Sequence, residues 1–162
     1  MPIESTIPYQ DITYQIIGAA MRVHSRLEPG LKEVHYQRAL ADEIIGANLQ
    51  VSEEHPVEIY DLDNWLGRLY LDLLVENAII VETKAFPHLL TNEETAQVIC
   101  YMAATGHKVG LLLNFGRKRL EYKRILPPRQ LEGWQDRVHR FLWHPKDPNV
   151  SPLPEKTPPS ES

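Results

Sequence analysis

The chain has 162 residues, 43% hydrophobic and 24% charged, a composition typical of a globular domain with room for one core. Its formal net charge is −5, so overall charge does not favour nucleic acid, and a polyanion would need a local basic patch or a metal ion. Cys100 is the single cysteine, which excludes a disulfide framework, a Cys-rich zinc site and an all-Cys iron–sulfur cluster within one chain.

Residues 1–10 are predicted to be a flexible arm, because Pro2 and Pro8 discourage regular structure. The arm has neither the basic flank nor the apolar stretch of a signal peptide. No apolar run anywhere approaches the roughly 18 residues that cross a membrane. We therefore expect a cytoplasmic protein with no membrane partner.

Two helices are predicted next, separated by Glu28-Pro29-Gly30. The first runs from Asp11, as its cap, to about Leu27. Its apolar stripe consists of Ile12, Ile16, Ala19, Ala20, Val23 and Leu27. The second runs from about Leu31 to Ala47, with Asn48 as C-cap. Its expected core positions are Leu31, Val34, Ala41, Ile44 and Ile45.

Extended structure is predicted from Gln50 to Tyr60, where Pro56 indicates an edge or broken strand. A turn at residues 61–64 leads into a hairpin from Leu66 to Lys84. In its first strand, two sets of side chains are expected on opposite faces. One set is Leu69, Leu71, Leu73 and Val75, and the other is Arg68, Tyr70 and Asp72.

The length of the hairpin loop decides whether two acids meet. A three-residue loop at 76–78 puts Val75 opposite Ile79 and Asp72 opposite Glu82, whereas a two-residue turn sends Glu82 to the other face. Lys84 shares the face of Glu82. Two neighbouring carboxylates repel, and a divalent cation would relieve that repulsion. The alternative is a solvated polar face with Lys84 as the counter-ion.

The remaining chain is predicted to begin with a helix from Asn92 to about Thr105, capped by Thr91 and ended by Gly106. A buried strand at 109–115, a turn at 116–119 and a strand at 120–126 follow. Residues 127–144 form an expected helical extension, and 145–162 a disordered Pro- and Ser-rich tail. The main domain is thus 11–126, an α/β fold with a mixed sheet between helices.

Further polar residues recur at helical spacing. Gly30, Glu33 and Tyr36 form G-x-x-E-x-x-Y, and Gln97 and Tyr101 are four residues apart on one helical face. With Asp72 and the E-x-K of residues 82–84, this set resembles the GxxExxY family of the PD-(D/E)xK nuclease superfamily. The resemblance runs from about residue 16 to 126, through IIGAAMRVHSRLEPGLKEVHY, LDLLVENAIIVETKA, AQVICYMAATGHKVGLLLNFG and LEYKRIL.

The resemblance implies a restriction-endonuclease-like αβββαβ core with extra terminal helices, and roles for its matching residues. Asp72 and Glu82 would bind Mg²⁺ or Mn²⁺, with the Thr83 carbonyl as a further ligand. Lys84 would orient or deprotonate the attacking water, or stabilise the phosphate in the transition state. Glu33 would face the same ion directly or through water, or else is a first-turn acid that favours the helix dipole.

Substrate contacts are expected from Gln97 and Tyr101, and from Tyr36 through stacking or a phosphate bond. The alternative for all three is a role in packing. The densest basic cluster, Arg117-Lys118-Arg119, is either a solvated turn or, with the basic pair at 123–124, a phosphate contact. The chain departs from the family at 93–95, where Glu-Glu-Thr stands in place of a common histidine.

Two functions follow from this interpretation. The first is a divalent-metal-dependent nuclease, for which DNA is the favoured substrate and RNA the second choice. The alternative is a catalytically inactive nucleic-acid-binding or protein-interaction module that retains the nuclease fold. The small domain offers little surface for a duplex, so a homodimer or a larger partner protein is a further expectation.

Overall fold

The computed structural model describes residues 9–127 as three helices around a mixed five-stranded sheet, which confirms the expected α/β class and element order. The elements are α1 Gln10–Leu27, α2 Glu33–Gly46, β1 Val51–Asp61, β2 Asn64–Val75, β3 Ile79–Lys84, α3 Asn92–Thr105, β4 Val109–Asn114 and β5 Glu121–Ile125. Most of the expected arm (1–8), the expected helix at 129–144 and the tail at 145–162 lie outside the described residues.

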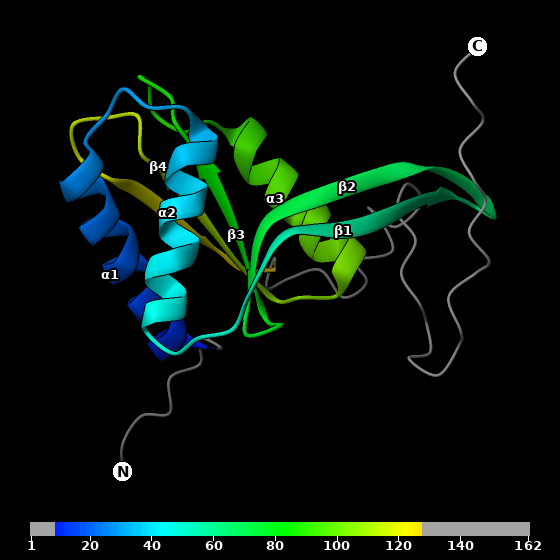
Figure 1. The fold of residues 1–162 in the computed structure, drawn as a ribbon. Helices are drawn as coiled ribbons and strands as arrows, with labels where there is room; N and C mark the ends of the chain where they lie inside the picture. Colours follow the sequence, from blue (N-terminus) through cyan, green and yellow to red (C-terminus); the bar gives the residue numbers. More distant parts are fainter. Residues whose placement is uncertain (1–8, 128–162) are drawn as a thin grey trace, which may run out of the picture.

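The five strands lie in chain order across the sheet, and within the described residues only β3 and β4 pair in parallel. Helix α3 connects these two strands, so their carboxyl ends, Lys84 and Asn114, meet at one edge of the sheet. Helices α1 and α2 cover one face and α3 the other, while the β1–β2 hairpin projects beyond the body (Figure 1). Carboxyl ends of neighbouring parallel strands are where α/β folds usually place their sites.

Each face of the sheet has its own hydrophobic cluster. The first lies under α1 and α2 and includes Ile16, Leu40, Leu73, Val81 and Phe115. The second lies under α3 and includes Leu71, Leu74, Ile80, Met102 and Leu112. Strand β4 is buried along its whole length, as its continuous apolar sequence predicted.

The β2–β3 connection is the three-residue loop, the alternative that brings the two acids together. Val75 pairs with Ile79 and Leu73 with Val81, so Glu76, Asn77 and Ala78 form the loop. The first two loop residues have left-handed φ angles of 53° and 49°. The register therefore confirms the arrangement in which Asp72 lies opposite Glu82.

The expected alternation along β2 is wrong at one point. Leu69 and Leu71 pack in the cluster under α3, whereas Leu73 and Val75 pack in the cluster under α1 and α2. The four apolar side chains therefore do not share one face. The change of face falls at Asp72. After this residue β2 pairs with β3, and before it β2 belongs to the projecting hairpin.

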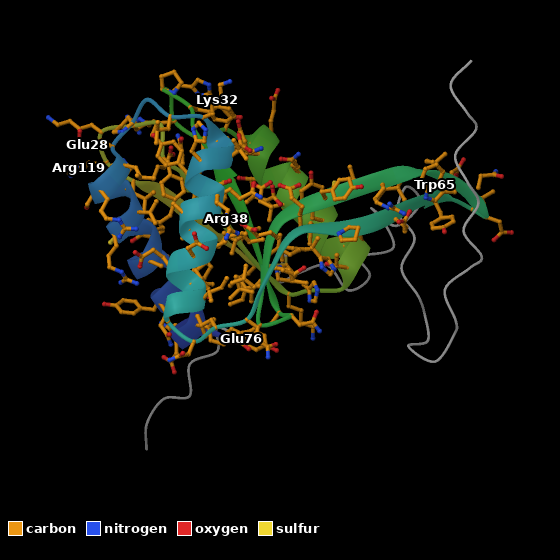
Figure 2. The ribbon with its side chains drawn as sticks, viewed as in Figure 1. Glu28, Lys32, Arg38, Trp65, Glu76 and Arg119 are labelled. Carbon is orange, nitrogen blue, oxygen red and sulfur yellow. The ribbon has the colours of Figure 1, made fainter. Side chains whose placement is uncertain are left out.

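Strand β1 is an edge strand, as Pro56 predicted. It pairs with β2 in one register up to Ile59–Gly67 and in another from Tyr60–Trp65, so Leu66 is the extra residue of a β-bulge. Asp61 pairs with Asn64, which confirms the turn at the tip. Trp65 lies at this far end of the hairpin in Figure 2.

Two of the three helices, α1 and α2, start at residues other than the predicted ones. Helix α1 begins at Gln10 after Tyr9, so Asp11 lies in the first turn and is not the cap. Its predicted stripe is otherwise on the buried side. Helix α3 matches its predicted bounds, with a capping box between Thr91 and Glu94. Within residues 9–127, no helix is long and apolar enough to cross a membrane.

Helix α2 presents a different face from the predicted one. It begins at Glu33, and its buried residues are Tyr36, Gln37, Leu40, Ala41 and Ile44. Three expected core residues are exposed: Leu31 by 42%, Val34 by 58% and Ile45 by 51%. Tyr36 stacks on Phe115, which turns the Tyr36–Leu40–Ile44 row toward the sheet. Asn48 follows the observed C-cap, Ala47, and has a left-handed φ of 63°.

Candidate functional site

The candidate site lies at the fork where β2 separates from β3. The β2–β3 pairing ends with Leu73 opposite Val81. The next residues toward the opening are Asp72 on β2 and Glu82 on β3. The amide of Asp72 donates to Glu82 Oε1 at 3.1 Å. The amide and hydroxyl of Thr83 donate to Asp72 Oδ2 at 2.8 Å and 2.9 Å. The two carboxylates thus bind backbone donors within the fork.

Burial makes these carboxylates hard to ionise. Glu82 is 3% exposed, and its burial and then the charge of Asp72 raise its pKa to about 9. Burial is also the main reason why the pKa of Asp72 is raised, although its hydrogen bonds from Thr83 oppose the rise. Lys84 lowers the pKa of both acids, so its ammonium group faces the same space. None of the salt bridges among residues 9–127 involves Lys84.

Helix α2 brings a third acid to the fork. Glu33 is its first residue and is half-buried. Desolvation raises the pKa of Glu33; Lys84 lowers it and Asp72 raises it. Helix α2 thus brings Glu33 near enough to Lys84 and Asp72 for their charges to affect its ionisation.

Helix α3 closes the opposite side of the fork. Tyr101 is 7% exposed, and its pKa is raised to about 12, first by burial and then by the charges of Glu82 and Asp72. Gln97 is exposed one turn earlier and donates to the Tyr101 hydroxyl at 2.8 Å. Gln97 and Tyr101 therefore contact each other on one face of the helix, as predicted, and Gln97 is the residue of the two that is exposed.

Tyr36 is not available to a substrate. Its side chain is fully buried, its ring stacks on Phe115 with centroids 4.9 Å apart, and its hydroxyl donates to the Glu28 carbonyl. The same hydroxyl accepts from the Leu31 amide at 3.1 Å. The expected base or phosphate contact of Tyr36 is therefore withdrawn, because its polar atom and ring face are already used.

The basic cluster Arg117-Lys118-Arg119 follows the carboxyl end of β4, which pairs with the carboxyl end of β3 at Lys84. It forms the turn between β4 and β5, and the His24 ring nitrogen bonds the Arg117 carbonyl at 2.7 Å. Lys84 is the cation that affects the pKa of the three acids. Arg119 lies with Lys32 and Glu28 at one end of the body in Figure 2. No residue of this cluster is among the groups that shift the pKa of the three acids.

Two residues near the fork were not identified from the sequence, Glu54 on β1 and Gln37 on α2. The pairs Glu53–Leu73 and His55–Leu71 put Glu54 opposite Asp72. Gln37 donates to Glu54 Oε1 at 2.6 Å. A simple two-residue hairpin would instead put Glu53 opposite Asp72. The bulge at Leu66 shifts the register by one, and the adjacent Gly67, with a φ of 156°, is the sequence signal that could have indicated it.

The donor set suits a hard divalent cation that retains water ligands. Within the described residues, no three His, Cys, Asp or Glu side chains meet closely enough to form a complete metal site. Mg²⁺ is commonly held by one or two carboxylates, with water and phosphate oxygens completing its shell. Asp72 and Glu82 can supply two such oxygens. Burial is the main cause of their raised pKa values, and a bound cation would oppose it by stabilising the carboxylate forms.

Comparisons with known proteins agree with the fold. The model of the family described as the PD-(D/E)XK nuclease superfamily matches residues 10–125, which contain every element from α1 to β5. Searches of curated proteins and of solved structures found no significant match.

Proposed function

Since the chain belongs to the PD-(D/E)XK nuclease superfamily, we propose that it hydrolyses phosphodiester bonds in DNA with a divalent cation, Mg²⁺ or Mn²⁺. Membership suggests nuclease activity on nucleic acid, and nucleases of this superfamily generally use divalent metal ions. The observation that carries the proposal is the fork, where Asp72 and Glu82 lie beside Lys84. The G-x-x-E-x-x-Y pattern supports assignment to the GxxExxY family within the superfamily.

The cation would be held by carboxylate oxygens of Asp72 and Glu82. Glu33 would reach it through a water molecule, and the Thr83 carbonyl would be a further ligand. When bound, such a cation lowers the pKa of a coordinated water and offsets charge on the phosphoryl oxygens. The hydrogen bonds from Thr83 to Asp72 and from the Asp72 amide to Glu82 fix the two ligands before binding.

Lys84 would act on the attacking water or on the phosphate. Lys84 is half-buried, lowers the pKa of all three acids and forms no salt bridge within residues 9–127. It can therefore orient a water molecule or donate to a phosphoryl oxygen as negative charge develops there. Gln97 and Tyr101 would contact the substrate beside the fork, and Arg117, Lys118 and Arg119 would bind its backbone farther along.

A second function is a binding or interaction module without catalysis. It is favoured by the net charge of −5 and by the presence of several acids beside one lysine at the fork, since both repel a polyanion. A homodimer or a larger partner would then supply the missing basic surface. The absence of cleavage together with salt-dependent DNA binding would support this alternative.

A cleavage assay tests the nuclease proposal. Plasmid and single-stranded DNA are incubated with Mg²⁺ or Mn²⁺ and with wild type, Asp72→Ala or Lys84→Ala. Loss of a positioned ligand or acid–base group should lower the rate at least about 100-fold. The exposed residues Asp63 and Lys108, changed to Ala, are matched controls and should cleave like wild type. Equal cleavage by all five proteins would reject the assigned site.

A further inference from the structure

Glu54 interrupts the β1–β2 ladder beside the fork. It lies on the edge strand, has a left-handed φ of 48°, and is placed opposite Asp72 by the pairs on either side. Edge strands carry such irregularities where a side chain is redirected. The side chain of Glu54 therefore belongs to the same row across the sheet as Asp72 and Glu82.

Gln37 holds Glu54 in this position. Its side chain is only 6% exposed, and its amide nitrogen donates to Glu54 Oε1 at 2.6 Å. The same nitrogen lies 3.4 Å from the carbonyl oxygen of Asp72, a longer and weaker hydrogen bond. Gln37 is one helical turn after Glu33 on α2. One buried amide thus links the helix of Glu33 to the strands of Glu54 and Asp72.

Glu54 lies close to a proposed metal ligand. It is opposite Asp72 in the register, and the amide nitrogen that donates to its carboxylate also reaches the Asp72 carbonyl oxygen. A carboxylate this close to a cation site attracts the cation. Glu53, one residue away, instead pairs with Arg38 at 2.6 Å. The two adjacent acids therefore have different surroundings.

We propose that Glu54, held by Gln37, is a positioning residue that strengthens divalent-cation binding at the fork without itself being a ligand. The proposal rests on the proposed function, because it requires the cation held by Asp72 and Glu82. Glu54 acts through the attraction of its carboxylate for the cation, and Gln37 holds that carboxylate beside Asp72. A substitution that removes the charge of Glu54 and keeps the shape of its side chain should then weaken the binding of the cation.

Calorimetric titration with Mn²⁺ alone tests this inference. Glu54→Gln keeps the size of the side chain and can still accept from Gln37, so it removes only the charge. Its Mn²⁺ affinity should fall about tenfold, the lower end of effects from residues that support metal ligands. The matched control is Glu53→Gln, which removes the same charge from the neighbouring residue and should bind Mn²⁺ like wild type. Glu54→Asp, which restores the charge, should recover most of the affinity.

The outcomes separate this inference from the function on which it rests. Wild-type affinity in Glu54→Gln, or an equal loss in Glu53→Gln, would overturn the role of Glu54. If wild type binds Mn²⁺ and Glu82→Ala does not, the metal site stands whatever Glu54 does. If wild type itself shows no binding, the metal site of the proposed function fails first. Unfolding temperatures without metal show whether each variant is folded. If Glu54→Gln does not fold, Glu54→Asp, which keeps the charge but shortens the side chain, is compared with wild type instead.

Discussion

The protonated carboxyl group of Glu82 should make the stability of the metal-free protein depend on pH. Its pKa is raised from 4.5 to about 9, chiefly by burial. The folded protein therefore keeps this proton over a range in which the unfolded chain has released it. The associated stability is fully present below the unfolded pKa near 4.5, and it is lost as pH rises through the folded pKa near 9.

The size of the effect follows from one proton. Between pH 6 and 8 the folded protein holds one more proton at Glu82 than the unfolded chain does. The free energy of unfolding should then fall by about 1 kcal/mol per pH unit, or roughly 2–3 kcal/mol across this range. For a chain of this size, that loss lowers the unfolding temperature by roughly 5–10 °C.

Thermal unfolding in a metal chelator at pH 6, 7 and 8 measures this loss. Glu82→Gln has no proton to release, so the difference between wild type and variant isolates this residue from other titrating groups. Wild type should lose stability relative to Glu82→Gln as pH rises. The exposed acid Glu93, changed to Gln, is the control and should follow wild type, because it removes a carboxylate from the surface and not from the fork. Parallel curves for wild type and Glu82→Gln would refute the argument that burial keeps this carboxyl group protonated.

Three further changes test the packing around the fork, each measured by denaturant unfolding. Tyr36→Phe leaves the Leu31 amide without its hydroxyl partner and should lower the free energy of unfolding by about 1–2 kcal/mol. Its Mn²⁺ affinity should stay at the wild-type value, and a large loss of affinity would restore Tyr36 to the site. Gly116→Ala should destabilise by about 1–3 kcal/mol, because an added Cβ would lie 2.4 Å from the Ala85 backbone, and an unchanged midpoint would contradict this contact. Asn114→Ala should lower the free energy of unfolding by at least about 2 kcal/mol. The buried Asn114 Oδ1 accepts from the Phe86 and Gly116 amides at 2.9 Å and 3.1 Å, and the variant leaves both without this partner. An unchanged free energy would mean that water replaces the side chain.

Local sequence signals predicted the parts of the fold that local interactions determine. Thr91, Glu94 and Gly106 fix both ends of α3 through caps that involve only neighbouring residues. The loop at 76–78 fixes the β2–β3 register, and with it the meeting of Asp72 and Glu82. The resemblance to a nuclease family then supplied the expectation that Glu33 belongs with them.

Features set by distant contacts were not predictable in the same way. The buried face of α2 depends on Tyr36 stacking against Phe115, which lies 79 positions later in the chain, so helical periodicity alone selected the exposed Leu31 and Val34. The role of Glu54 depends on a bulge at Leu66, near the far end of the hairpin. A one-residue change of register there decides which of two adjacent glutamates lies opposite Asp72.

The fork links folding and the proposed chemistry through the same two side chains. Where β2 leaves β3, the amides of Asp72 and Thr83 are satisfied by the carboxyl groups of Glu82 and Asp72. These bonds stabilise the opening of the sheet, and burial favours a neutral Glu82 while no cation is present. A cation at the fork would require the ionised form, so its binding at neutral pH must displace the Glu82 proton and must strengthen as pH rises toward 9. The geometry that stabilises the sheet without metal therefore also determines how strongly the affinity for the metal depends on pH.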